Sequence, residues 1–231
     1  VAGLPGRVAR FEGDASLSRR PMRRIAAPLS DMGARIDFEG AGGHDGLPMR
    51  VHGMPLSALT VVNTHASAQV KGALILAGLA SGAGVTVQEP QRSRDHTERM
   101  LVARGVHLTI TEHGVVLPPA QTLSAVDVVV PSDPSSATFF AALAALADDG
   151  ELRLENVCLN PTRTGAFDVL RRMGARIDIV DERTIGGETI GTLVVAPASL
   201  QATAIGGAEI PRCIDELPMI ACVAARAVGE T

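Results

Sequence analysis

The stretch MGARIDFE, residues 32–39, recurs almost unchanged as MGARIDIV at residues 173–180, and a weaker copy, RGVHLTIT, occupies residues 104–111. The glycines of the three copies, 72 and 69 residues apart, are Gly33, Gly105 and Gly174. Each copy follows a helix-like segment and leads into residues that alternate as in a strand. A glycine directly after a helix suits the left-handed C′ position, so the copies predict three equivalent junctions from helix to strand.

A second series of segments, rich in alanine, alternates with these copies at residues 66–82, 135–150 and 215–229. Each begins at a Ser or Asp suited to cap a helix, and the first two lead into strand-like runs, GVTVQEP and GELRLENV. The repeating unit is therefore helix, strand, strand, helix, strand, about 70 residues long. This pattern predicts an α/β fold with mixed sheets packed on helices, and the weakest join lies in LSAVDVVVPSDPSS, residues 123–136.

The composition argues against several classes of protein. A net charge of −4 and five Phe without Trp or Tyr do not favour a nucleic-acid-binding surface, which is basic and uses aromatic stacking. No apolar run reaches the roughly 18 residues of a membrane span. The three cysteines, Cys158, Cys213 and Cys222, lack the spacing of metal ligands or of a disulfide framework, which fits a reducing cytoplasm. We interpret Cys213 and Cys222 as small hydrophobic residues.

The ends of the chain carry their own expectations. It opens VAGLPGRVARFEGD, without Met and without the apolar segment of a signal peptide, so we expect no targeting sequence. It stops at Gly-Glu-Thr, where the strand of the last unit is expected to begin. From these two features we expect a piece of a longer protein.

The stretch RSRDHTERM, residues 92–100, places five charged residues at the start of one expected helix. Asp95 and Glu98 have the spacing of a capping box, with Asp in the cap role. Helix N-termini attract anions, and Arg94 at this point adds a planar group suited to phosphate or carboxylate. The simpler interpretation is a solvated ion pair between Arg94 and Glu98.

The stretch HASAQVKG, residues 65–72, starts an apolar helix with the small polar side chains of Ser67 and Gln69. These residues either cap the helix or present a hydroxyl, an amide and free N–H groups to an anionic ligand. Lys71 is expected at the surface.

Arginines gather in GDASLSRRPMRR, residues 13–24, which is the most basic part of the chain. Pro21 fits the first turn of a helix, and Arg20 lies just before it. This stretch is either a solvated basic turn or a second clamp for an anion.

An acidic pair occurs in CIDELPMIA, residues 213–221. Asp215 or Glu216 either caps the last helix or serves as a general base beside an anion pocket. Taken together, the four stretches predict a pocket where helix N-termini converge on a small molecule with several negative charges.

The chain resembles the 3-phosphoshikimate 1-carboxyvinyltransferase (EPSP synthase) family. The residues that carry the resemblance are, in order, GDASLSRRPM, ASAQVKGALILAGL, EPQRSRDHTERML, PSSATFF, MGARI and IDELP. It runs from about residue 11 to the last residue, and its most specific part is SRDHTERML together with SAQVKGA. The resemblance implies repeated βαβαββ units of the enolpyruvyl transferase fold, an inside-out α/β barrel, here as two partial domains.

The resemblance also implies an activity. The family transfers the enolpyruvyl group of phosphoenolpyruvate to the 5-hydroxyl of shikimate 3-phosphate and releases phosphate, a step toward chorismate and the aromatic amino acids. It implies no metal and no organic cofactor. It implies small-molecule substrates as the partners, no nucleic acid and no membrane, with a cytoplasmic location and a monomer at full length.

Family roles transfer to matching positions only. By this resemblance, Ser67, Ala68, Gln69 and Arg94 hold shikimate 3-phosphate, together with Asp215. Arg20 and Gln69 contact phosphoenolpyruvate. Asp215 is also the catalytic residue, as proton acceptor for the attacking hydroxyl.

The chain departs from the family in several motifs. The early Lys-containing motif, the Asn-Ala-Gly-Thr loop and the later Lys, Arg and His-Arg elements do not occur in these 231 residues. We therefore expect residues 1–125 to be most of the domain that binds shikimate 3-phosphate. Residues 126–231 are then the start of the second half of the other domain, and this chain is expected to have little or no turnover.

Two alternatives remain open. UDP-N-acetylglucosamine enolpyruvyl transferase shares the fold but uses a catalytic Cys in this region, and no Cys precedes Cys158 here. A non-catalytic ligand-binding or structural fragment belongs to another class. Ligand choice separates the two enzymes, and turnover separates both from the fragment.

Overall fold

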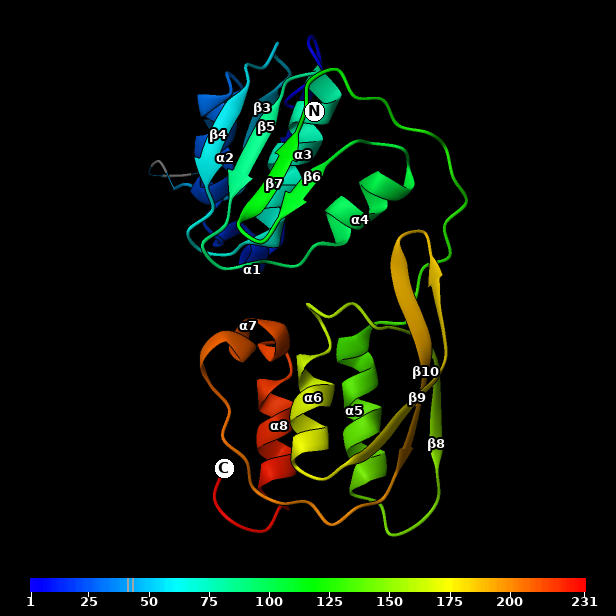
Figure 1. Ribbon diagram of the computed structural model, residues 1–231. Helices are drawn as coiled ribbons and strands as arrows, with labels where there is room; N and C mark the ends of the chain where they lie inside the picture. Colours follow the sequence, from blue (N-terminus) through cyan, green and yellow to red (C-terminus); the bar gives the residue numbers. More distant parts are fainter. Residues whose placement is uncertain (41, 43) are drawn as a thin grey trace. The chain divides into compact units, whose positions relative to one another are not determined.

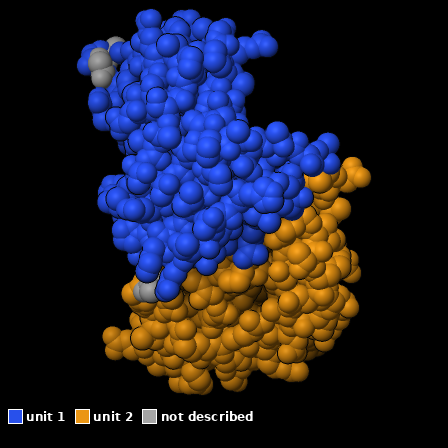
Figure 2. Space-filling model, turned by 45° about the horizontal axis from the view of Figure 1, so that its top comes forward, with its two compact units in different colours: residues 1–125 blue, residues 126–231 orange. Residues whose placement is uncertain are grey.

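A computed structural model describes residues 1–40, 42 and 44–231, with the side chain at position 208 left aside. It divides the chain into two compact units, unit 1 with residues 1–125 and unit 2 with residues 126–231, which Figure 2 shows in different colours. Both units combine helices with sheets (Figure 1). The predicted α/β class is confirmed.

Unit 1 holds two sheets that follow each other along the chain. The first has the order β1-β3-β2, with every pair antiparallel, and the second has the order β4-β5-β7-β6, with β4 and β5 parallel. The first part consists of β1 (Val8–Phe11), α1 (Ala15–Ser18), α2 (Arg23–Asp31), β2 (Arg35–Phe38) and β3 (Met49–His52). The second part consists of β4 (Leu59–Val62), α3 (Ala68–Ser81), β5 (Val85–Gln88), α4 (His96–Ala103), β6 (Thr109–Thr111) and β7 (Gly114–Leu117). The second part is one complete βαβαββ unit.

Unit 2 repeats this plan around one antiparallel sheet of order β8-β10-β9. Its elements are α5 (Pro134–Ala145), β8 (Leu152–Cys158), α6 (Gly165–Arg172), β9 (Arg176–Ile185), β10 (Glu188–Ala196), η2 (Gly207–Glu209), α7 (Ile210–Cys213) and α8 (Leu217–Ala224). Helices α5, α6 and α8 lie side by side and contact one another (Figure 1).

Two predicted helix starts differ from the structure. Helix α2 begins at Arg23 with Met22 at the N-cap, so Pro21 precedes the helix and does not lie in its first turn. Helix α5 begins at Pro134, before the expected start at residue 135, and it is capped by Asp133, whose side chain accepts from the N–H of Ser136. Proline suits the first helical position because it has no N–H group that would need an acceptor. The expected cap at Ser67 of α3 is confirmed.

The three predicted junctions share one backbone geometry. Their glycines are left-handed, with φ of 106° at Gly33, 82° at Gly105 and 101° at Gly174. The N–H of the residue after each glycine donates a hydrogen bond to the carbonyl five residues earlier, which is the 6→1 bond of a Schellman motif. These bonds are Ala34 to Leu29 at 3.0 Å, Val106 to Leu101 at 3.0 Å and Ala175 to Leu170 at 2.9 Å.

A backbone hydrogen bond between residues farther apart in the sequence completes each junction. The carbonyl of the residue before the glycine accepts from an N–H beyond the next two strands. The donors and acceptors are Ser57 to Met32 at 2.7 Å, Ser124 to Arg104 at 2.9 Å and Gln201 to Met173 at 2.7 Å. The sequence repeat is therefore a repeat of hydrogen bonding, and it closes each helix-strand-strand segment on itself.

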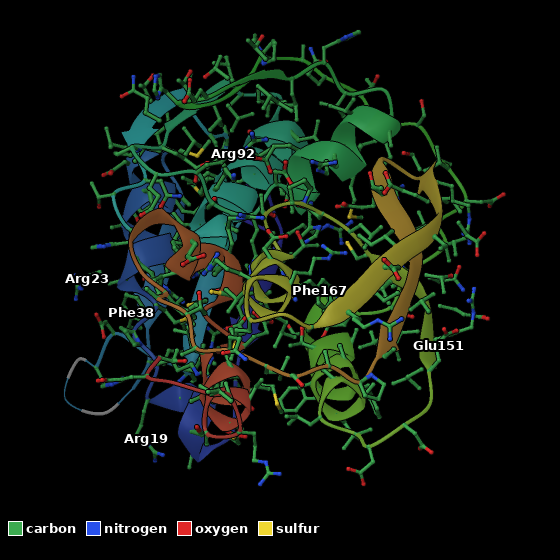
Figure 3. All side chains as sticks on the ribbon, turned by 60° about the horizontal axis from the view of Figure 1, so that its bottom comes forward. Arg19, Arg23, Phe38, Arg92, Glu151 and Phe167 are labelled. Atoms are coloured by element: carbon green, nitrogen blue, oxygen red, sulfur yellow. The ribbon has the colours of Figure 1, made fainter. Side chains whose placement is uncertain are left out.

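Each unit has its own hydrophobic core. Leu74 and Ile75 of α3 are fully buried in unit 1, and Met32 from the first junction lies in the same cluster. In unit 2 the core gathers around Phe167 of α6, which is 1% exposed (Figure 3), and includes Met173 from the third junction. Among the described residues, no helix is both long and apolar enough to cross a membrane.

We predict that Gly174→Ala lowers the free energy of unfolding of unit 2 by about 1–2 kcal/mol, because an L side chain is strained at positive φ. An added Cβ there would also lie 3.2 Å from the carbonyl oxygen of Ser199. Urea unfolding followed by far-UV circular dichroism measures the loss. Gly206→Ala is the matched control, because Gly206 is extended with φ of 179° and has open space around it. Equal effects of the two substitutions would contradict the prediction.

Candidate substrate-binding site

The start of α3 is held by Asn63, which follows β4. The amide oxygen of Asn63 accepts from the N–H of Ser67 at 3.2 Å, and its amide nitrogen donates to the carbonyl of Ser67 at 3.1 Å. Ser67 in turn caps the helix, since its hydroxyl accepts from the N–H of Val70 at 3.4 Å. Ala66, just before the cap, is left-handed with φ of 46°, a conformation that non-glycine residues rarely adopt. The backbone at the start of α3 is thus fixed from both sides.

The first turn of α3 leaves donors for a ligand. A helix has no internal acceptors for its first N–H groups, and Ser67 satisfies only that of Val70. Within the described part of the chain, the N–H groups of Ala68 and Gln69 have no acceptor. Aligned N–H groups with the helix dipole attract negative charge.

An arginine of α2 joins this entrance. The guanidinium of Arg24 donates to the side-chain oxygen of Gln69 at 3.1 Å. Arg20, which the resemblance assigns to phosphoenolpyruvate, lies in the exposed turn before α2, and its N–H donates to the carbonyl of Leu17 at 3.1 Å. Arg19 and Arg23 are exposed and point outward (Figure 3). The structure therefore joins Arg24, which sequence reasoning placed only in a basic patch, to a predicted site residue.

The segment between β5 and α4 carries Arg94, which is half-buried. The predicted capping box beside it is wrong. Asp95 occupies the N-cap of α4, but its carboxylate accepts from Arg92 and from Arg99, each at 2.9 Å, and makes no side-chain cap bond. Two guanidinium partners compete better for a carboxylate than one backbone N–H.

Lys71 is buried, which corrects the expectation of a surface residue. Its side chain is 1% exposed, and its ammonium contacts a carboxylate oxygen of Glu89 at 2.9 Å and one of Glu98 at 2.6 Å. Both glutamates are also buried. The expected solvated pair of Arg94 with Glu98 is wrong for the same reason, because Glu98 turns inward to Lys71. A buried charge is tolerated when it is paired and hydrogen-bonded.

Glu89 connects the two segments described above. One of its oxygens accepts both from the amide of Asn63 at 2.9 Å and from the hydroxyl of Ser93 at 2.5 Å. Asn63 clamps Ser67, and Ser93 precedes Arg94 in the chain. The entrance of α3 and the Arg94 segment are therefore fastened to the same carboxylate. This arrangement links Ser67 and the segment that carries Arg94 to one carboxylate within unit 1.

Sequence reasoning missed the buried ion pairs of Lys71 with Glu89 and Glu98, although one signal pointed to them. Lys71 is the only charged residue in α3, and seven residues of that helix, including Lys71 itself, are buried. A single charge in a helix that is buried on most sides requires a counter-charge from another element.

In unit 2, Asp215 is exposed and lies just before α8. Its neighbour Glu216 is 2% exposed and occupies the N-cap position without a side-chain cap bond, so the predicted acidic cap is wrong. The carboxylate of Glu216 instead accepts from the hydroxyl of Ser135. Arg163 donates to Ser135 and to Asp133, each at 2.8 Å. Burial alone would raise the pKa of Asp133, but its bonds from Ser136 and the charge of Arg163 outweigh this and lower it.

The cysteines are free thiols. Cys213 is fully buried, and this burial, followed by the nearby charges of Glu209 and Glu216, raises the pKa of its thiol. The interpretation of Cys213 as a small hydrophobic residue is confirmed. Cys222 is exposed, so the same interpretation is wrong for that residue.

Comparison with known proteins identifies relatives over the whole chain. A family model of EPSP synthase (3-phosphoshikimate 1-carboxyvinyltransferase) matches residues 1–231. The 3-phosphoshikimate 1-carboxyvinyltransferase of Bacillus subtilis is 47% identical over the full chain, which covers 53% of that relative. The protein of the same name from Chloroflexus aggregans is 48% identical over 96% of the chain, which covers 51% of that relative. The chain thus spans about half the length of the curated relatives it matches.

Solved structures agree with this assignment. An EPSP synthase from Acinetobacter baumannii superposes with a TM-score of 0.86 at 38% identity, covering 99% of this chain and 51% of that one. The enolpyruvyl transferase NikO from Streptomyces tendae superposes with a TM-score of 0.65 at 20% identity, covering 96% of this chain and 51% of that one. The second likeness concerns the fold alone. The predicted enolpyruvyl transferase fold is confirmed.

We predict that Lys71→Met lowers the free energy of unfolding of unit 1 by about 3–5 kcal/mol, because it leaves two buried carboxylates without their counter-charge. Urea unfolding followed by far-UV circular dichroism measures the change. Arg35→Met is the control, since Arg35 is 67% exposed in its ion pair with Asp37, and its loss is expected to cost less than about 1 kcal/mol. A loss at position 71 no larger than that at position 35 would show that the buried ion pairs do not stabilise the fold.

Proposed function

The chain belongs to the EPSP synthase (3-phosphoshikimate 1-carboxyvinyltransferase) family, and we propose that it contributes substrate-binding elements to that reaction. The reaction transfers the enolpyruvyl group of phosphoenolpyruvate to the 5-hydroxyl of shikimate 3-phosphate and releases phosphate. It proceeds by addition to a tetrahedral intermediate and elimination of phosphate, and it uses no metal or organic cofactor.

One observation carries the proposal. The first turn of α3 and the segment with Arg94 are fastened to the same carboxylate of Glu89, so N–H donors and a guanidinium are held in one unit. Donors of this kind suit a ligand with a phosphate and a carboxylate. In the proposal, Ser67, Ala68, Gln69 and Arg94 hold shikimate 3-phosphate.

The remaining roles follow the family pattern. Arg20 and Gln69 contact phosphoenolpyruvate, and the contact of Arg24 with Gln69 supports a positively charged surrounding for that substrate. Asp215 also touches shikimate 3-phosphate and accepts the proton of the attacking hydroxyl as general base. Asp215 is exposed and lies directly before Glu216, the N-cap residue of α8.

The two units take different parts in this proposal. Residues 1–125 form most of the domain that binds shikimate 3-phosphate. Residues 126–231 form the beginning of the second half of the other domain. The partners are the two small substrates, with no nucleic acid and no membrane, and the full-length enzyme is a cytoplasmic monomer. The net charge of −4 supports the absence of a nucleic-acid partner.

Calorimetric titration with shikimate 3-phosphate tests the binding role. We predict that the chain binds this ligand and that Arg94→Ala weakens binding by about 10- to 100-fold, the loss of one or two charge-assisted hydrogen bonds. Arg104→Ala is the matched control, because this substitution removes the same charge at the other end of α4. Equal weakening by both variants would refute a specific role of Arg94. Preference for UDP-N-acetylglucosamine over shikimate 3-phosphate would favour the other enolpyruvyl transferase.

We also predict that the chain by itself has little or no turnover. The Lys-containing, Asn-Ala-Gly-Thr and His-Arg elements that the family uses to grip its substrates do not occur in these 231 residues. Phosphate release from phosphoenolpyruvate and shikimate 3-phosphate measures the activity, with the full-length Bacillus subtilis relative as positive control. A rate comparable to that of the control would contradict this prediction.

A further inference from the structure

We propose that Glu89, held by Lys71, is a positioning residue that fixes the entrance of α3 and the Arg94 segment relative to each other. The inference rests on the proposed function, because it assigns to Glu89 the task of keeping the two halves of the shikimate 3-phosphate site in register. Glu89 acts through other residues, and no role in contacting the substrate is assigned to it.

The hydrogen bonds of Glu89 support this role. Its side chain is 3% exposed, and both oxygens are occupied. One oxygen accepts from Asn63 at 2.9 Å and from Ser93 at 2.5 Å, and the other accepts from Lys71 at 2.9 Å. The three donors come from the loop after β4, the segment before α4 and helix α3. One carboxylate therefore joins three separate parts of unit 1.

Two of the three donors, Asn63 and Ser93, are bonded to or directly precede a residue of the proposed site. Asn63 binds both the N–H and the carbonyl of Ser67, so its position determines where the first turn of α3 begins. Ser93 directly precedes Arg94. A shift of the Glu89 carboxylate would thus move the N–H donors of Ala68 and Gln69 and the guanidinium of Arg94 relative to each other.

Lys71 keeps Glu89 in place and couples it to α4. Its ammonium bridges Glu89 and Glu98, the latter at 2.6 Å on α4. The two helices also approach closely at Gly72, where an added Cβ would lie 2.9 Å from the hydroxyl oxygen of Thr97. The distance between α3 and α4 is therefore limited by packing as well as by charge.

Such a linkage suits the recognition of a rigid anion. Positioned donors contribute most to affinity when they do not have to be ordered on binding. If the two segments moved independently, binding would have to order both, and affinity would fall although every contacting residue remained.

Ser93→Ala tests the proposal with little disturbance, since Glu89 keeps its bonds from Asn63 and Lys71. We expect the dissociation constant for shikimate 3-phosphate, measured by calorimetry, to rise about tenfold, equivalent to one lost hydrogen bond. We expect hydrogen exchange, measured by mass spectrometry, to become faster at residues 63–70 and 90–96 and to stay unchanged elsewhere in unit 1. Glu89→Gln, which keeps the shape but weakens the pairing with Lys71, is expected to act in the same direction.

Ser81→Ala is the matched control. At the other end of α3, the hydroxyl of Ser81 donates to the carbonyl of Gly78 at 3.1 Å and accepts from the N–H of Ala83 at 3.3 Å, so the control also loses serine hydrogen bonds. We expect its affinity and its exchange at residues 63–70 and 90–96 to match those of the unaltered chain.

The two readouts separate this inference from the proposed function. If the unaltered chain does not bind shikimate 3-phosphate, the proposed function fails, and exchange alone decides whether Glu89 couples the two segments. Unchanged exchange at both segments in Ser93→Ala would overturn the inference. Faster exchange spread evenly over unit 1 would overturn it too, because that result marks a general structural role.

Discussion

The site of unit 1 depends on the ion pairs that the ammonium group of Lys71 forms with Glu89 and Glu98. The ammonium group lies where α3, the end of β5 and α4 meet, and water reaches none of the three side chains to any extent. Charges placed in such an interior are costly unless they are paired. The three elements therefore hold their relative positions, and the residues of the proposed site are carried on these elements.

The scaffold around this cluster comes from a short backbone device used three times. A left-handed glycine ends a helix, a Schellman bond closes it, and a bond from beyond the next two strands fastens the junction. The left-handed glycine at the end of the helix was predictable from sequence, because a left-handed residue favours glycine and the glycine is visible in every copy of the repeat. The bond from beyond the next two strands was not predicted. Helix capping by Ser67 was predictable on the same local grounds.

The interior of the site was not predictable, because its partners are distant in sequence. Lys71 is 18 residues from Glu89, and no local pattern shows that their side chains meet. The pair Asp95 and Glu98 has the spacing of a capping box, but neither carboxylate makes the cap bonds. Asp95 pairs with Arg92 and Arg99 close by in the sequence, and Glu98 pairs with Lys71 of the preceding helix. Arg24 likewise became part of the site only through a contact 45 residues away. Local rules succeed where the backbone alone sets the geometry and fail where charged side chains choose among several partners.

The balance of charge is compatible with the proposed binding of an anion beside buried glutamates. Glu89 and Glu98 with one lysine would leave a negative excess close to the entrance of α3, and an anionic substrate would be repelled by it. Four arginines on or near these elements offset this excess, namely Arg24, Arg92, Arg94 and Arg99. Asp95 is the counter-ion of two of them, Arg92 and Arg99. The guanidinium groups lie nearer to solvent than the glutamates, so a ligand arriving from water meets the positive groups first. In the proposed function, these guanidinium groups offset the negative charge of the buried carboxylates, although the chain as a whole has a net charge of −4.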